Sequence, residues 1–265
     1  MAAVQEAAGS QWLPDMESIK QELGRQDPTV LSVAVALLAV LVTLLLWKVL
    51  RRSQTSRRAV LLVGLCDSGK TLIFSRLLTG KYMKTQTSIS PNTALYRVKR
   101  EKGSSFTLVD VPGHESLRVQ CMEQYKPAAR ALVFLVDSSA FQRDLKEVAE
   151  FLYQILTDAT IVRNAPPILI ACNKQDISMA KSAKLIQQQL EKELNTLRVT
   201  QSAAPSTLDS SGSPAITQLG KKGKDFDFSQ LPMKVEFLEC SCRDSKEEEG
   251  DANLSNIEGW LTKLA

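Results

Sequence analysis

Gly64-Leu65-Cys66-Asp67-Ser68-Gly69-Lys70-Thr71 is the stretch of this 265-residue chain that decides its fold. It has the spacing G-x-x-x-x-G-K-T, in which successive backbone N–H groups wrap a di- or triphosphate. Lys70 can reach the terminal phosphates, and the hydroxyl of Thr71 can ligate Mg²⁺. We therefore predict a nucleotide and magnesium site whose loop contacts run from Gly64 to Leu72.

The residues on both sides of this loop have the pattern that such a site requires. Residues 59–63 are a short apolar run fit for a buried strand, and residues 71–78 read as a helix that closes at Gly80. Strand, loop and helix in this order are the structural context of a phosphate-binding loop.

The composition is that of an ordinary globular protein with a formal net charge of +4. Basic and aromatic residues are not interleaved as on RNA-binding surfaces, so we expect no direct nucleic acid partner. The five cysteines form no C-x-x-C pair and only one histidine is present, which gives no zinc pattern. Reduced, buried thiols in a cytosolic domain fit this usage best.

An uncharged run from Val30 to Trp47 consists almost wholly of Leu, Val and Ala. As a helix, its roughly 18 residues span about 27 Å, close to the hydrocarbon thickness of a bilayer. A buried core helix would show a polar stripe, and a cleaved signal peptide would begin with a basic segment. We expect a single transmembrane anchor in the lipid bilayer.

The charges flanking this run set its expected orientation. The segment before it is mainly acidic, whereas the segment after it contains Lys48, Arg51, Arg52, Arg57 and Arg58. Basic residues favour the cytosolic side. We therefore expect a lumenal N-terminus at residues 1–29, an anchor at 30–47, a basic linker at 48–58 and a cytosolic nucleotide-binding domain at 59–265.

Beyond the linker, continuous apolar runs alternate with amphipathic segments. Apolar runs without alternation indicate strands buried on both faces, so we predict a doubly wound α/β domain with a mostly parallel sheet. The expected strands are residues 93–98, 106–109, 131–136, 168–172 and 235–238, and the expected helices are residues 145–156, 180–199 and 257–264. On helix 180–199, Leu185, Leu190, Leu194 and Leu197 would share one side.

Residues 200–230 depart from this pattern, since their first part is rich in Ser, Thr, Pro, Ala and Gly. Such a composition buries too little apolar surface to order itself. We interpret the segment as a flexible insert before the last strand, and a partner-binding loop stays open as the alternative.

Asn173-Lys174-Gln175-Asp176 follows the strand at 168–172 and selects the nucleotide. A carboxylate at Asp176 can accept hydrogen bonds from guanine N1–H and the exocyclic amine, whereas adenine would leave it unpaired. The stem of Lys174 can lie along the base, and Asn173 can tie this loop to the phosphate loop. A polar helix start capped by Asp176 is the alternative.

Asp110-Val111-Pro112-Gly113-His114 is the third motif. Asp110 ends a strand and is placed to hold Mg²⁺ directly or through water, while the Gly113 N–H can report a γ-phosphate. A turn after a strand could be the whole explanation. The order of the three motifs along the chain favours the nucleotide site.

In this order, the three motifs resemble those of the small Ras-like GTPases. The phosphate loop from Gly64 to Thr71 is most similar in character to that of the Arf and Sar1 branch. The anchor, the run Asp110–Arg118 and the helix Lys181–Val199 with its Ser/Pro tail more closely resemble the beta subunits of the signal recognition particle receptor. This resemblance covers the chain from the anchor onward. It implies an endoplasmic reticulum membrane protein whose GTP-bound domain holds the receptor alpha subunit for cotranslational targeting.

The resemblance also assigns residues. Switch I would fall within Thr85–Thr93, with nucleotide contacts at Thr85, Gln86, Thr87 and Ser88, and the metal-ligating hydroxyl is left open among Thr85, Thr87, Ser88 and Thr93. Ser241-Cys242 stands where the family has a Ser-Ala-Lys turn near the guanine oxygen; this chain has Cys242 and Arg243 there.

His114 stands where Ras-like enzymes usually have the Gln that orients the attacking water. It is a candidate for positioning water, and a packing role in switch II stays open. We expect slow GTP hydrolysis and a nucleotide-dependent binding module. An autonomous Arf- or Sar1-like GTPase in membrane traffic remains the alternative.

Overall fold

The computed structural model describes residues 32, 36–44, 57–98, 105–203, 219–221, 223–243 and 253–264. The chain divides into two compact units, residues 1–56 and 57–265. In the first unit, residues 36–44 are helical and expose their apolar side chains. Among the described residues, no helix combines the length and the apolar content needed to cross a bilayer. Eight of the 18 residues of the expected anchor at 30–47 lie outside the described residues.

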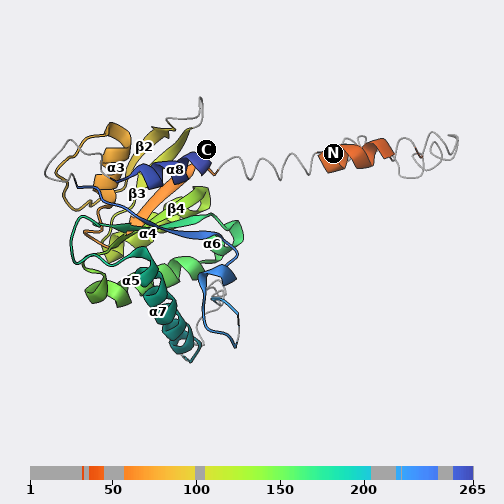
Figure 1. The fold of residues 1–265 in the computed structure, drawn as a ribbon. Coiled ribbons are helices and arrows are strands. Elements are labelled where there is room, and N and C mark those ends of the chain that lie inside the picture. The colour runs from red at the N-terminus through yellow and green to blue at the C-terminus, as the bar shows by residue number, and fades with distance from the viewer. Residues whose placement is uncertain are drawn as a thin grey trace, which may run out of the picture. The chain divides into compact units, whose positions relative to one another are not determined.

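A six-stranded sheet forms the centre of the second unit (Figure 1). The strand order is β2-β3-β1-β4-β5-β6. All neighbours are parallel except β2 and β3, which are antiparallel, so the mostly parallel sheet is confirmed. The strands are β1 (Ala59–Gly64), β2 (Asn92–Arg97), β3 (Ser105–Asp110), β4 (Ala129–Asp137), β5 (Ile168–Asn173) and β6 (Val235–Glu239).

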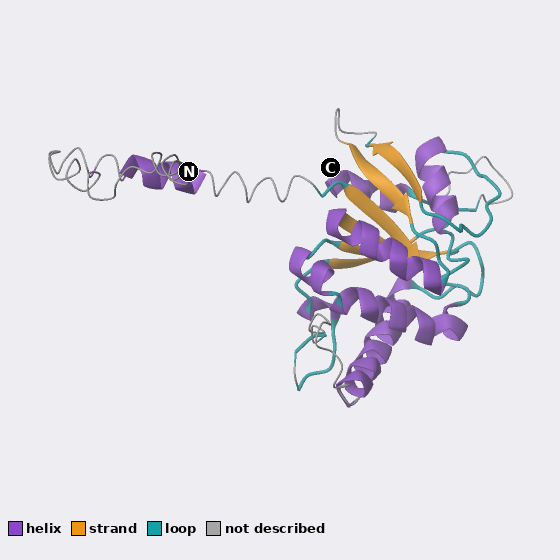
Figure 2. Cartoon of the chain, turned by 180° about the vertical axis from the view of Figure 1, so that it is seen from behind, coloured by secondary structure: helices purple, strands orange, loops and turns teal. Residues whose placement is uncertain are grey.

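Helices cover both faces of this sheet (Figure 2). Side chains of α3 and α8 pack on one face, and those of α4, α5, α6 and α7 pack on the other. The helices are α3 (Lys70–Thr79), α4 (Glu115–Tyr125), α5 (Phe141–Thr157), α6 (Ala159–Asn164), α7 (Ala183–Ala203) and α8 (Ser255–Leu264), with short 3₁₀ turns η1 (Lys126–Ala128) and η2 (Phe228–Gln230).

The central strands explain why their sequences show no alternation. On β1, Leu61 and Val63 enter the cluster under α5 and α7, while Val60 and Leu62 enter the cluster under α3 and α8. All four side chains are fully buried. Successive residues of a strand point to opposite faces, and here both faces are covered, so every position is apolar.

Helix α7 begins three residues later than expected, and its buried side contains two of the four leucines expected to share a side. Ile186, Leu190 and Leu194 are fully buried, whereas Leu185 is 36% exposed. The inward residues follow an i, i+4 spacing, which keeps them on one side of a helix. Leu190 and Leu194 share one side as expected, whereas Leu185 does not share it and Leu197 packs only at the margin of the cluster.

The insert is partly packed, which corrects our interpretation of its second half. Leu219, Phe226 and Phe228 are buried in the cluster that contains α7. Arg198 of α7 donates to the carbonyl oxygens of Lys221 (3.1 Å) and Lys224 (2.7 Å). The aromatic residues supply the apolar area that the Ser- and Pro-rich half lacks. Residues 204–218 lie outside the described residues.

Asp158 directly follows α5 and forms an ion pair with Lys126, the first residue of η1. As the N-cap of α6, it accepts from the backbone N–H groups of Thr160 (2.8 Å) and Ile161 (3.0 Å), and Lys126 Nζ lies 2.6 Å from its carboxylate. Burial alone would raise the pKa of Asp158, but these hydrogen bonds outweigh burial and lower that pKa. The ionised form is therefore favoured in the folded state.

Replacing Asp158 with Ala should lower the free energy of unfolding by about 2 kcal/mol at neutral pH, because a cap and a partly buried ion pair are lost. A folded-state pKa below the ordinary value of 3.8 contributes stability above that value, and the contribution is lost as the pH falls through the folded-state pKa. Urea unfolding should thus show a difference that shrinks in acid to what the cap alone contributes. Asp158→Asn, which keeps the cap, should give an intermediate loss at neutral pH that vanishes in acid; a loss in the Asn variant that persists in acid would contradict this account.

Candidate functional site

The phosphate loop is held in a backbone conformation that its residue types permit. Gly64, Asp67 and Gly69 have φ values of 148°, 58° and 92°. A Cβ on Gly64 would lie 2.4 Å from the Leu135 carbonyl oxygen, and one on Gly69 would lie 2.3 Å from Nδ2 of Asn173. The glycines are therefore required by close backbone packing as well as by left-handed φ angles.

Lys70 is a buried cation at the centre of this loop. Its side chain is 6% exposed, and Nζ donates to the Leu65 carbonyl oxygen at 2.6 Å. Burial lowers the pKa of Lys70, although the nearby carboxylate of Asp110 acts in the opposite direction. Because burial of the Lys70 ammonium outweighs the effect of Asp110, an anionic ligand beside Nζ would stabilise the charged form.

Asp110, at the end of β3, collects three polar side chains. Its Oδ2 accepts from the Thr71 hydroxyl (2.8 Å), from Asn92 Nδ2 (3.0 Å) and from the Ser88 hydroxyl (3.3 Å). The Thr71 and Ser88 hydroxyl oxygens are 3.0 Å apart. Oxygen atoms from three separate segments thus meet beside the phosphate loop.

The residues around Asp110 fit a magnesium ion. Asp110 is fully buried, and within the described part of the chain its Oδ1 has no hydrogen-bond partner. Mg²⁺ prefers oxygen ligands and is usually bound through one or two protein side chains plus phosphates. An unpaired buried carboxylate oxygen beside two hydroxyls supplies that kind of ligand set.

Gly113 lies against the phosphate loop. A Cβ added to Gly113 would lie 2.6 Å from the backbone nitrogen of Cys66 and 2.8 Å from Nζ of Lys70. The backbone of Gly113 is therefore close to both the loop amide and the loop ammonium that attract a terminal phosphate. Only a residue without a side chain fits there.

Asn173 connects the base-side loop to the phosphate loop, and this expected contact is confirmed. The side chain is 1% exposed, and its Nδ2 donates to the Ser68 carbonyl oxygen at 2.8 Å. Its Oδ1 accepts from the thiols of Cys242 (3.3 Å) and Cys240 (3.7 Å). Sequence reasoning missed these two thiol contacts.

Lys174 is held by a partner that the sequence did not reveal. It has a φ of 65°, and its Nζ donates to Asp137 Oδ2 at 2.6 Å. Burial alone would raise the pKa of Asp137, but hydrogen bonds from Lys174, Ser139 and the backbone of Ala140 lower it. The ion pair fixes the direction of the Lys174 stem. The position of Asp137 at the end of β4, beside β5, was the available signal.

Asp176 is oriented by Ser241, which follows β6. The Ser241 hydroxyl donates to Asp176 Oδ1 at 2.7 Å, and Gln175 N donates to the Cys240 carbonyl oxygen at 3.2 Å. The two loops expected to read a base are thereby joined. Cys242 is 3% exposed, and burial raises its pKa to about 12, so its side chain stays a neutral thiol.

The remaining candidates are more exposed. Thr85, Gln86 and Thr87 are exposed, while Ser88 is half-buried. His114 is exposed, and its Nδ1 lies 3.0 Å from the Ser116 hydroxyl in the first turn of α4. Cys66 is exposed too, unlike the other four cysteines, so the expected burial fails at this loop position.

Comparison with known proteins identifies the family. The family described as "Signal recognition particle receptor beta subunit" matches residues 55–235. A mouse protein named signal recognition particle receptor subunit beta is 63% identical over 262 residues, covering 99% of this chain and 97% of the relative.

Solved structures agree with this match. A chain from a structure described as that of the mammalian SRP receptor is 61% identical, with a TM-score of 0.68, and covers 78% of this chain and 100% of that one. A Chaetomium thermophilum chain described as an SRb-GTP/SRX complex is 22% identical, with a TM-score of 0.57, over 77% of this chain and 97% of that one, which shows a shared fold. This chain belongs to the beta subunit family of the signal recognition particle receptor.

Proposed function

We propose that this chain is the GTP-binding subunit that holds the receptor alpha subunit at the endoplasmic reticulum membrane for cotranslational targeting. The observation that carries the proposal is the contact of Gly113 with the phosphate loop. A third phosphate beside Lys70 requires the segment after β3 to move away. Nucleotide identity is thereby coupled to a surface segment, as in switch proteins.

Different groups of residues bind the phosphates, the Mg²⁺ ion and the base of the nucleotide. The loop from Gly64 to Leu72 takes the phosphates, and Thr71, Ser88 and Asp110 provide oxygen ligands for Mg²⁺, the group that neutralises phosphate charge when bound. Asn173, Lys174 and Asp176 read guanine, with Ser241 and Cys242 supporting their loop. Ser88 is our choice for the switch I hydroxyl, because its oxygen lies 3.0 Å from that of Thr71.

Ser88→Ala should lower the apparent Mg²⁺ affinity of the GTP-loaded protein by about tenfold, since one polar contact of about 1.4 kcal/mol is lost. The measurement is the rate of GTP dissociation over a range of free Mg²⁺. Thr85→Ala and Thr87→Ala are the matched controls and should behave as wild type. Equal effects from all three substitutions would remove the special role of Ser88.

We further propose that residues 30–47 anchor the chain, with residues 1–29 lumenal, 48–58 a basic linker and 59–265 cytosolic. The apolar side chains exposed along the helix at 36–44 support this assignment, because water is an unfavourable surrounding for them. Alkaline extraction of membranes containing the full chain should leave it in the pellet. Release into the supernatant would contradict an anchor that spans the bilayer.

We expect this chain to bind GTP tightly enough to act as a binding module and to hydrolyse it slowly. His114 is exposed and lies beside Ser116, so it is not fixed over the phosphate loop. A general base or water-positioning group must lie within hydrogen-bond reach of the water that it activates. Single-turnover hydrolysis by the purified protein should be slow, and a single-turnover rate constant of about tens per second would contradict this proposal.

An autonomous Arf- or Sar1-like GTPase is not favoured, because the relatives above are receptor beta subunits. A binding assay with purified candidates distinguishes the two functions. The GTP-loaded full chain should retain the receptor alpha subunit and should not retain vesicle-coat proteins. Retention of coat proteins alone would support the alternative.

A further inference from the structure

The edge of the sheet at which β1, β3, β4, β5 and β6 begin, here called the linker edge, lies opposite the phosphate loop. Arg57 stands there two residues before β1 and donates to the Asn164 carbonyl oxygen (2.9 Å) and to Asn164 Oδ1 (2.8 Å). Arg130 donates to the Leu264 carbonyl oxygen at the end of α8. Arg57 and Arg58, the described end of the basic linker, therefore lie at this edge.

Cations exceed carboxylates along the linker edge in the part of the chain that the structure describes. Lys126 holds both Glu123 and Asp158, and Lys234 lies 2.9 Å from Glu236. The remaining cations of this edge are exposed: Arg58 before β1, Arg97 at the end of β2, Arg163 at the end of α6 and Lys263 in the last turn of α8.

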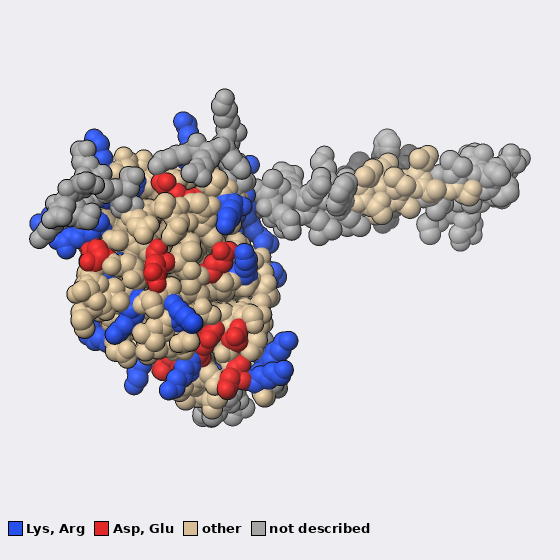
Figure 3. All heavy atoms as spheres, in the orientation of Figure 1, with Lys and Arg blue, Asp and Glu red and all other residues tan. Residues whose placement is uncertain are grey.

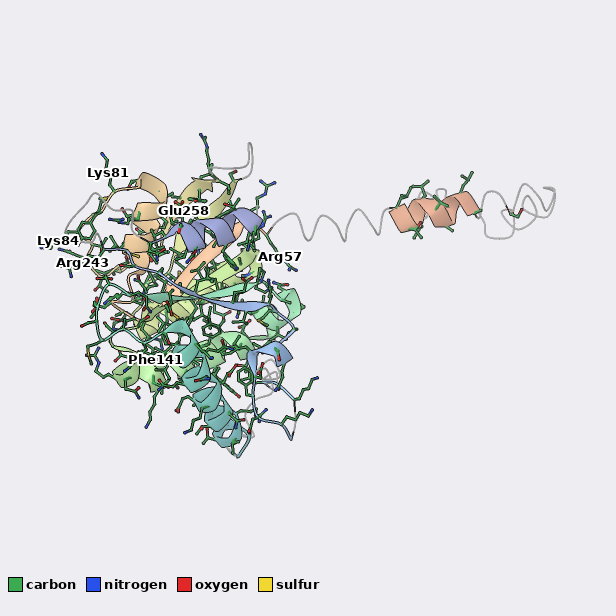
Figure 4. All side chains as sticks on the ribbon, in the orientation of Figure 1. Arg57, Lys81, Lys84, Phe141, Arg243 and Glu258 are labelled. Atoms are coloured by element: carbon green, nitrogen blue, oxygen red, sulfur yellow. The ribbon has the colours of Figure 1, made fainter. Side chains whose placement is uncertain are left out.

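The figures agree with this distribution. Several Lys and Arg side chains lie at the side of the domain where β1 begins, and others are spread over the rest of the visible face (Figure 3). Arg57 lies on that side, whereas Lys84 and Arg243 lie at the opposite side, next to the switch I and guanine loops (Figure 4). The six-residue strands separate the two edges by about 20 Å.

We propose that the linker edge binds the anionic phospholipid headgroups of the membrane. The inference rests on the anchor proposed above. The segment 48–56 between the anchor and Arg57 can span at most about 30 Å, so the domain must stay near the bilayer surface. A basic surface close to anionic lipid is attracted to it within a Debye length.

This contact would orient the domain. With the linker edge on the headgroups, the phosphate loop and the guanine loops face the cytosol. The segment around Gly113, which the nucleotide moves, is then presented away from the bilayer to a soluble partner. The lipid contact thus restricts rotation of the domain about its short linker and favours the partner-binding orientation.

The test uses the unit Arg57–Ala265, which contains the whole sheet and both hydrophobic clusters. A chain of the mammalian SRP receptor structure is covered in full by 78% of this chain, so a protein of about this size folds without the rest. Sedimentation with phosphatidylcholine vesicles, with and without phosphatidylserine, measures the partition coefficient. Phosphatidylserine should increase binding of the wild-type unit, and added salt should reverse the increase.

A charge variant and a matched control localise the effect. Arg58→Gln, Arg163→Gln and Lys263→Gln together should lower the partition coefficient by about a hundredfold, at roughly fivefold for each cation near the surface. Lys146→Gln, Lys184→Gln and Lys192→Gln remove the same charge from α5 and α7 and should bind as wild type. No phosphatidylserine effect, or equal losses in both variants, would overturn the proposal.

Two further measurements keep the outcomes separate. GTP binding should be equal in all three proteins, and its absence from the wild-type unit would count against the proposed function while the vesicle result stands. Binding of a single-stranded RNA that is lost with the first variant, without a phosphatidylserine effect, would make this edge a nucleic-acid surface and overturn the lipid assignment.

Discussion

Replacing Asp176 with Asn should lower the affinity of the chain for GTP by about a thousandfold, because two hydrogen bonds to a carboxylate are each worth about 2 kcal/mol. Xanthine has a carbonyl oxygen where guanine has its exocyclic amine, and the amide N–H of Asn can donate to that oxygen. The affinity for xanthosine triphosphate should therefore rise. Equilibrium titration of the variant with both nucleotides measures the exchange.

The substitution should leave the fold intact. The Ser241 hydroxyl donates to Asp176 Oδ1 at 2.7 Å, and the amide oxygen of Asn can accept the same hydrogen bond. Glu150→Gln, an exposed carboxylate on α5, is the matched control and should bind GTP as wild type does. If the Asp176 variant keeps full GTP affinity, then Asp176 does not read the base.

Lys70→Met should have opposite effects on binding and on stability. GTP affinity should fall by at least about a hundredfold, since charge-assisted hydrogen bonds to two phosphates are lost. Without nucleotide, the variant should unfold at a higher temperature than wild type, because burial of the ammonium is costly, as the lowered pKa of Lys70 indicates. Met keeps most of the volume of the side chain.

Two features allow the change in stability of the Lys70→Met variant to be attributed to the buried ammonium. The Leu65 carbonyl oxygen keeps a partner in the variant, because the Ser68 hydroxyl donates to it at 2.9 Å. Lys146→Met, at an exposed position of α5, controls for the general effect of replacing Lys with Met. Thermal unfolding and nucleotide titration are measured on the same samples. A variant that is less stable and binds GTP normally would contradict the role given to Lys70.

Local patterns predicted most of the sheet and the phosphate loop. Buried strands with helices on both faces consist of unbroken apolar runs, and β1, β4 and β5 lie within a few residues of their expected positions. The contact of Asn173 with the phosphate loop also followed, since both motifs lie at the carboxyl ends of parallel strands.

Two helices escaped prediction because their apolar pattern is weak. Helix α4 buries Arg118 beside Cys121 and Met122, and the Arg118 guanidinium lies over the ring of Phe151. A charged residue on the inward side conceals the amphipathic period. Helix α6 has six residues, too few to show a period at all.

The partners of the site residues could not be found from separate motifs. Asn92 reaches Asp110 because β2 pairs antiparallel with β3 and places these two residues opposite each other. Asp137 meets Lys174 through the pairing of β4 with β5. These contacts depend on strand register, which the chain sets through the whole sheet and not through any one motif.

Our account requires that GTP binding, by moving the segment after β3, increases the affinity of this chain for the receptor alpha subunit. The most direct test is calorimetric titration of the alpha subunit into the full chain in detergent, loaded in turn with GDP and with a non-hydrolysable GTP analogue. We predict binding at least tenfold tighter with the analogue, a coupling free energy of about 1.4 kcal/mol or more. Equal affinities in the two nucleotide states would contradict the account.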